Sequence, residues 1–198
     1  MGIVCNGPQK SGTNALRAIV ASLGFESVAG GFEGGHYRHK RRGTRVPWSE
    51  FEPELGAGQV ISGHDPSLTT SHVHLRLVRD RRNIAVSWFR AIMAHRGEAI
   101  SPQAFRRWLM APDARKMYGV LARFSDWFDR DDAFHYETLF DPAVVMDIAR
   151  RCGVPYRQTD AYGKSGTWTG RPSQWSERFD DHSLKWFQAK LIRISRKV

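Results

Sequence analysis

The chain has 198 residues, of which 41% are hydrophobic and 12% aromatic, and this composition excludes a disordered or fibrous protein. Lysine and arginine outnumber aspartate and glutamate by 30 to 20, so the charge of +10 indicates an anionic partner, either a nucleic acid or a nucleotide. The two cysteines, Cys5 and Cys152, do not suggest a disulfide framework, and no apolar run approaches the roughly 20 residues that cross a bilayer. We expect a cytoplasmic protein with a single domain spanning residues 1–198.

The first predicted elements are a strand, a loop and a helix. Residues 3–5 are β-prone and lead into a Gly/Ser loop over residues 7–13. Apolar residues then recur at helical spacing from Leu16 to Leu23, and Gly24 is a helix stop. Residues 29–47 are rich in glycine and basic residues without periodicity, which predicts an exposed loop.

Strands and helices then alternate along the chain. The predicted strands are residues 59–62, 74–78 and 133–136, and the predicted helices begin at Asp80, Ser101, Asp113 and Asp141, with a last amphipathic helix near the C-terminus. This alternation favours an α/β fold, which we expect to be a single P-loop-like, three-layer domain with a mainly parallel central sheet flanked by helices.

The loop after the first strand has the composition of an anion site. Its sequence is Gly7-Pro8-Gln9-Lys10-Ser11-Gly12-Thr13-Asn14. Between a strand and a helix, such a loop presents backbone N–H groups and a helix N-terminus to a phosphate. Thr13 occupies the position at which the Walker pattern requires lysine, which argues against an ordinary ATPase or kinase.

This loop resembles the 5′-phosphosulfate loop of sulfotransferases that use 3′-phosphoadenosine-5′-phosphosulfate (PAPS), typically Pro-Lys-Ser-Gly-Thr-Thr-Trp-Leu. The chain departs from that pattern at Gln9, which is inserted, and at Asn14-Ala15, which replace Thr-Trp. Residues 77–87 are similar to the family's 3′-phosphate segment, because Arg79 ends a strand and Ser87 follows eight residues later. The guanidinium group of Arg79 suits a phosphate monoester.

Two further segments are similar to the family. Tyr136, in His-Tyr-Glu-Thr-Leu, matches a tyrosine that the resemblance places near the adenine. Residues 170–179 match a C-terminal loop in spacing, but Trp168 and Thr169 replace its basic pair, so Arg171 or Lys164 would supply the charge for the 3′-phosphate.

The resemblance implies an enzyme that transfers the sulfuryl group of PAPS to a hydroxyl or amine and releases 3′-phosphoadenosine-5′-phosphate (PAP). Lys10 would neutralise the leaving oxygens. The residues that it assigns to the donor are Lys10, Ser11, Gly12, Thr13, Asn14, Arg79, Ser87, Tyr136, Gly170 and Arg171.

His64 is the predicted catalytic base. It follows an apolar strand, and the family carries a histidine at a similar place upstream of the 3′-phosphate arginine. An imidazole pKa near 6.5 suits a base at neutral pH. His36, His39 and Asp65 are the alternative bases.

No metal site is predicted, because His72 and His74 on one strand face lack further ligands and fit alternating polar positions on an edge strand. The acceptor is expected to be a small molecule or a carbohydrate. Its walls would come from residues 95–118 and from residues 29–48, with Phe32, His36, Tyr37, Arg38 and Trp48.

Three other functions stay open. A P-loop-type kinase would bind ATP, and a PAP-binding protein without turnover would bind only the product nucleotide. A basic nucleic-acid-binding protein would show a steep salt dependence, although the charge is spread along the chain apart from residues 39–42.

Overall fold

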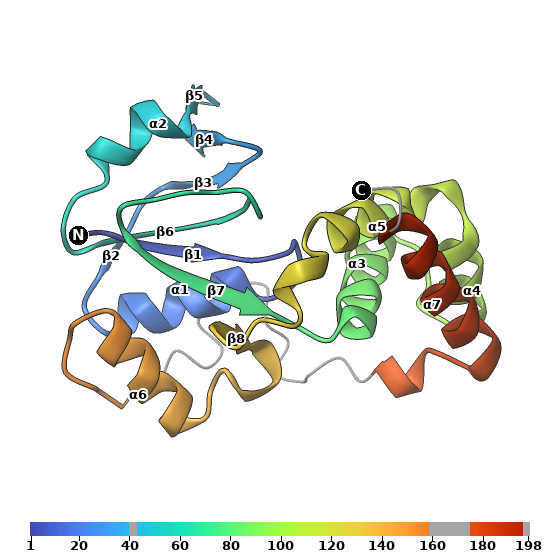
Figure 1. Cartoon of the computed structure of the whole chain (residues 1–198). Coiled ribbons are helices and arrows are strands. Elements are labelled where there is room, and N and C mark those ends of the chain that lie inside the picture. Colours follow the sequence, from blue (N-terminus) through green and yellow to red (C-terminus); the bar gives the residue numbers. More distant parts are fainter. Residues whose placement is uncertain (40–42, 159–174, 196–198) are drawn as a thin grey trace. The chain divides into compact units, whose positions relative to one another are not determined.

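In a computed structural model, residues 1–39, 43–158 and 175–195 are described, and they form an α/β fold around one sheet (Figure 1). The strand order is β5-β4-β3-β6-β1-β7-β8, with β2 also pairing with β6. The strands are β1 (Ile3–Asn6), β2 (Glu26–Ser27), β3 (Gly30–Glu33), β4 (His36–His39), β5 (Arg45–Pro47), β6 (Gln59–His64), β7 (Val73–Val78) and β8 (Ala133–His135). All pairs are parallel except β3–β4 and β4–β5, which confirms the predicted mainly parallel α/β fold.

The described chain divides into two compact units. The first unit consists of residues 1–78 and 130–158 and holds the whole sheet. The second unit consists of residues 79–129 and 175–195 and is helical. None of the described helices has the length and apolar character needed to cross a membrane.

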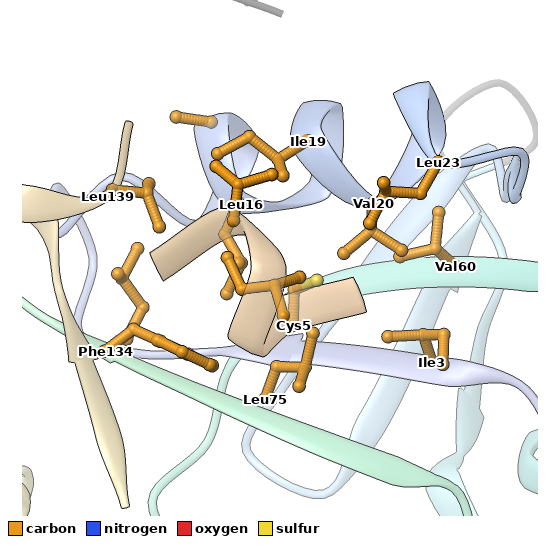
Figure 2. Close-up of a cluster of buried hydrophobic side chains, with 14 of the residues drawn as sticks. Ile3, Cys5, Leu16, Ile19, Val20, Leu23, Val60, Leu75, Phe134 and Leu139 are labelled. Atoms are coloured by element: carbon orange, nitrogen blue, oxygen red, sulfur yellow. The ribbon is translucent and has the colours of Figure 1, made fainter. Parts of the chain in front are cut away.

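In the first unit, the sheet is covered on one face by α1 (Thr13–Ser22) and α6 (Pro142–Arg151). Alternation along the strands sorts the side chains, so that Ile3 and Cys5 enter this core and Val4 enters the core on the other face. Figure 2 shows the α1 side chains above the strand side chains, with Leu16 and Ile19 pointing toward the sheet. This packing holds α1, and the loop before it, over β1 and β6.

The segment 29–47 is not the exposed loop that we predicted. Gly34 and Gly35, with φ of 55° and 72°, form a two-residue turn that pairs β3 with β4 in antiparallel register, and β5 then extends the sheet. Two consecutive residues with positive φ are typical of a type I′ hairpin, and Gly-Gly adopts it without strain.

The aromatic residues of this hairpin form a core instead of an acceptor wall. Phe32 and Tyr37 pack with α2 (Trp48–Phe51), which is followed by the 3₁₀ turn η1 (Glu52–Glu54). Phe32, Tyr37 and Trp48 are each at most 7% exposed, and the Tyr37 and Phe51 rings stack at 3.7 Å. These three aromatics pack on one another and on α2, which argues against the predicted role of this segment as an exposed acceptor wall.

The second unit has its own apolar core. Its elements are α3 (Arg81–Arg96), α4 (Pro102–Met110), η2 (Pro112–Ala114), α5 (Arg115–Arg123), η3 (Ser125–Trp127), η5 (Trp175–Glu177) and α7 (Asp181–Ser195). Phe105, Trp108 and Tyr118 are buried there with Phe187 of α7. Within residues 95–118 these side chains are core residues, whereas Ile100 and Met110 are exposed, at 40% and 39%.

Most predicted helix starts are confirmed. Asp80, Ser101 and Asp141 each accept a hydrogen bond from a backbone N–H of the first helical turn. The helix predicted from Asp113 instead begins with the turn η2, and α5 ends at Arg123. After β8, the chain forms the turn η4 (Tyr136–Thr138), which leads toward α6.

Candidate active site

The loop between β1 and α1 has the backbone geometry of an anion site. The Ser11 N–H donates to Pro8 O at 3.0 Å, and Lys10 takes a left-handed conformation with φ of 70°. Gly12 is the N-cap of α1 and provides no side-chain cap, so the first amide groups of a ten-residue helix keep their donors for another acceptor. A left-handed non-glycine residue is a strained conformation that is enriched at ligand sites.

Ser11 provides a second sign of an anion. The residue is fully buried, and its Oγ has no hydrogen-bond partner among the described residues. A buried hydroxyl without a partner is costly, and an anion oxygen in the loop would supply one. Thr13 is also buried, whereas Asn14 is exposed. The loop therefore fits the phosphosulfate group predicted for it.

The Tyr136 ring packs against the loop at Gly12. A Cβ atom added to Gly12 would lie 2.3 Å from Cδ2 of the Tyr136 ring, and Gly12 has a φ of 102°. Only glycine allows both this backbone conformation and this close approach. Tyr136 is 8% exposed, so most of its ring is used in this contact and in the core under α1.

His64 ends β6 next to the same loop. Its Nδ1 lies 2.8 Å from Gly7 O, and since a carbonyl oxygen only accepts, Nδ1 carries the proton and donates. Nε2 is then the basic nitrogen of the neutral ring. Burial lowers the pKa of His64, opposed by the Gly7 hydrogen bond and the Glu33 charge, and the Lys10 charge lowers it further. His64 is therefore neutral at pH 7.

Lys10 and Glu33 bring opposite charges to the site. The side chain of Lys10 is exposed, but partial burial of its ammonium group lowers its pKa. Glu33, at the end of β3, is in register with His64 on β6. Glu33 Oε1 accepts a hydrogen bond of 2.8 Å from Gln9 Nε2, which joins the hairpin to the loop.

Behind the loop, Asn6 joins Asp65, which follows β6, to His74, near the start of β7. Asn6 Oδ1 accepts from the Asp65 N–H at 3.0 Å, and Asn6 Nδ2 donates to Asp65 O at 2.6 Å and to His74 Nε2 at 3.1 Å. Asp65 Oδ2 accepts from the Gly35 N–H, and Asp65 Oδ1 accepts from Ser67. Asp65 is 3% exposed and holds strands together, which argues against its alternative role as the base.

The two other alternative bases lie on β4, which is separated from β6 by β3. His36 Nδ1 lies 2.8 Å from Gly34 O and 3.3 Å from Arg45 Nη2. The placement of β4 therefore favours His64 over His36 and His39.

The interpretation of His72 and His74 as an edge-strand pattern is wrong, because β7 lies between β1 and β8. His72 Nδ1 accepts from the Gly2 N–H, and its Nε2 donates to Glu52 O. Within the described residues, no group of three or more His, Cys, Asp or Glu side chains could hold a metal ion.

The second unit begins with Arg79, which directly follows β7 in the chain and is 7% exposed. Asp80 caps α3 and pairs with Arg82, whose guanidinium carbon lies 3.7 Å from the centroid of the Trp175 ring. The Trp175 N–H donates to Asn83 Oδ1 at 3.2 Å, and this hydrogen bond joins η5 to the start of α3.

Ser87 is partly buried and lies on α3 four residues after Asn83, which places both on one side of that helix. Lys10 to Asn14, His64 and Tyr136 thus belong to the first unit, and Arg79 and Ser87 to the second. Gly170, Arg171 and Lys164 lie outside the described residues.

Solved structures of the same fold include two of retinol dehydratase. One contains retinol and PAP, with a TM-score of 0.55, and the other contains androsterone and the inactive cofactor PAP, with a TM-score of 0.54. Each is 12% identical in sequence, and each alignment covers 98% of this chain and 80% of the other. Neither protein-family models nor curated protein sequences give a match. The chain therefore has the fold of retinol dehydratase.

Sequence reasoning missed Glu33 and Asn6. A Gly-Gly pair flanked by Phe32 and Tyr37 is a hairpin signal, and recognising it would have placed Glu33 at the end of a strand. Asn6 carries no comparable signal, since its role depends on the partners that the sheet brings to it.

Proposed function

We propose that this protein is a sulfotransferase that uses PAPS and releases PAP. The observation that carries the proposal is the β1–α1 loop: its buried Ser11 hydroxyl has no hydrogen-bond partner among the described residues, and its Gly7 carbonyl accepts a hydrogen bond from His64. The fold shared with retinol dehydratase structures that contain PAP supports the same nucleotide. We extend the proposal to a hydroxyl or amine acceptor on a small molecule or carbohydrate, and to a cytoplasmic location.

In this proposal, the loop binds the 5′ end of the donor. The amide groups at the start of α1 and the Ser11 hydroxyl bind its oxygens, and Thr13 and Asn14 extend the contact along the first turn of α1. The ammonium group of Lys10 provides positive charge where negative charge develops on the leaving group. PAPS, when bound, supplies the sulfuryl group that is transferred.

His64 is proposed as the base. Its Nδ1 proton is held by Gly7 O, so Nε2 has the lone pair that accepts the proton of the acceptor hydroxyl. The lowered pKa keeps this nitrogen unprotonated at neutral pH. The Gly7 hydrogen bond also orients the ring, because rotation of the imidazole would break it.

From the sequence resemblance, Arg79 and Ser87 are proposed to bind the 3′-phosphate. A guanidinium group and a hydroxyl supply several donors to a phosphate monoester. Gly170 and Arg171 are proposed to contribute to the same phosphate. Tyr136 is proposed to lie near the adenine, and its contact with Gly12 couples it to the loop.

The experiment that tests the donor is a thermal-shift assay with PAP, ADP and ATP. A ligand that binds only the folded state at about one hundred times its Kd adds about 2.7 kcal/mol, which raises the Tm of a chain of this size by about 5–10 °C. We expect that shift with PAP and a much smaller one with ADP, which lacks the 3′-phosphate. Equal shifts with ADP and PAP would contradict the assignment of Arg79 and Ser87.

Variants test in the same assay whether Arg79 recognises the 3′-phosphate. Arg79→Ala should remove most of the difference between PAP and ADP, whereas Arg90→Ala, on the exposed side of α3, should retain it. Stabilisation by ATP rather than PAP would favour the kinase alternative. Binding to DNA with a steep salt dependence, together with no response to PAP, would favour the nucleic-acid alternative.

A further inference from the structure

Glu33 is a carboxylate at the active site for which the predicted mechanism has no role. It is exposed, lies at the end of β3 and is in register with His64 on the neighbouring parallel strand β6. Its carboxylate accepts a hydrogen bond from Gln9, which is the residue inserted in the phosphosulfate loop. This contact fixes the carboxylate at the rim of the loop.

The strand pattern places Glu33 and His64 on the same face of the sheet. Val60 lies in the core under α1, so Ser62 and His64, two and four residues later, face the same way. Phe32 lies in the opposite core, so Glu33 faces the α1 side as well. The Glu33 charge raises the pKa of His64, which is consistent with this placement.

A carboxylate at this position repels anionic groups of an acceptor and attracts cationic ones. The donor carries several negative charges, and Lys10 is the loop cation that those charges require. An acceptor with its own cation would lie between two anionic groups and gain from both. The acceptor hydroxyl would then meet His64 while its cation meets Glu33.

We propose that Glu33 selects an acceptor that carries an ammonium group close to the hydroxyl that receives the sulfuryl group. Neighbouring strands are about 4.8 Å apart, so the ammonium nitrogen and the hydroxyl oxygen should be separated by about 5 Å. Hydroxybenzylamines satisfy this spacing, as do amino alcohols and amino sugars in which at least three carbon atoms separate the nitrogen from the oxygen. The proposal rests on the sulfotransferase function proposed above, and it excludes acceptors with a carboxylate in the same position.

The test compares three phenols that differ in one substituent: 3-hydroxybenzylamine is cationic, 3-ethylphenol is neutral and 3-hydroxyphenylacetate is anionic. We expect kcat/KM with PAPS to be higher for the cationic than for the neutral phenol by up to about fivefold, which is the largest factor that an exposed ion pair contributes. The anionic phenol should be the poorest. In Glu33→Gln the ratio of cationic to neutral should fall to about one.

The matched control is Glu26→Gln. Glu26 is also an exposed glutamate of the sheet, but it pairs with Gln59 at the opposite end of β6. This variant should keep the wild-type ratio. Equal kcat/KM values for the cationic and neutral phenols, or a ratio that survives in Glu33→Gln, would overturn the proposal.

Two measurements separate this proposal from the proposed function. The PAP thermal shift is recorded before any acceptor is added, and its absence would contradict the sulfotransferase function itself. If PAP binds but no phenol is turned over, the thermal shifts of the PAP complex with the cationic and neutral phenols decide, and equal shifts overturn the role of Glu33.

An NMR titration tests the placement of Glu33 beside His64. Glu33→Gln should lower the pKa of His64, with the Lys10 charge unchanged. An unchanged His64 pKa would overturn the proposal.

Discussion

Protonation of His74 should destabilise the folded protein. Asn6 Oδ1 accepts from the Asp65 N–H, which fixes the orientation of the Asn6 amide and leaves Nδ2 to donate to His74 Nε2. A protonated His74 would place a second donor opposite that amide. Burial, the largest effect, and the charge of Arg76 lower the pKa of His74 to about 4, although Asp132 opposes them.

The magnitude follows from the two pKa values. An unfolded histidine has a pKa of about 6.5, so the unfolded chain binds more protons between about pH 6.5 and pH 4. The contribution of neutral His74 to the free energy of unfolding is therefore fully present above about pH 6.5 and is lost as the pH falls toward 4. Between pH 7 and pH 5 this difference in proton binding lowers the free energy of unfolding by about 2 kcal/mol if the ring is fully buried. Because His74 is partly exposed, we expect a loss of about 1–2 kcal/mol.

Urea unfolding at pH 7 and pH 5 measures this loss. In His74→Gln the titrating group is absent and the side-chain oxygen can still accept from Asn6, so the variant should lose about 1–2 kcal/mol less than the wild type. His95→Gln, at an exposed position of α3, should behave like the wild type. Equal losses in all three proteins would refute the reasoning, as would an NMR titration of His74 with a midpoint near 6.5.

The remaining predictions concern the loop and the base. Gly12→Ala should lower the free energy of unfolding by more than about 1 kcal/mol and weaken PAP binding in a thermal-shift assay, because the new Cβ atom would clash with the Tyr136 ring. The control is Gly24→Ala: Gly24 also has a positive φ, of 112°, but its Cβ atom would have no atom within 4 Å, so this variant measures backbone strain alone. His64→Ala should keep the PAP shift but lose about 10²- to 10⁴-fold in turnover, and the wild-type rate should fall below the lowered His64 pKa; full activity of the variant would refute the role of the base. Lys10→Ala should reduce kcat far more than PAP affinity, and complete loss of PAP binding would make Lys10 an anchor instead.

Local signals in the sequence determined much of the fold. The Gly/Ser loop between an apolar strand and a periodic helix predicted β1, the loop and α1. Asp80 and Asp141 predicted helix starts because a capping carboxylate acts within one turn of its own helix. His64 was placed at a strand end by the apolar run before it. Each of these features depends on residues that are neighbours in sequence, so a pattern can reveal it.

Only the tertiary structure decided which distant residues meet. The Gly34-Gly35 turn brings Glu33 beside His64, because the hairpin pairs with β6 through contacts that span thirty residues of chain. Tyr136 reaches Gly12 because β8 joins the sheet beside β7. Asn6 connects Asp65 and His74 because β6 and β7 flank β1 in one register. Strand order and register are set by burial of whole faces, and no local pattern records them.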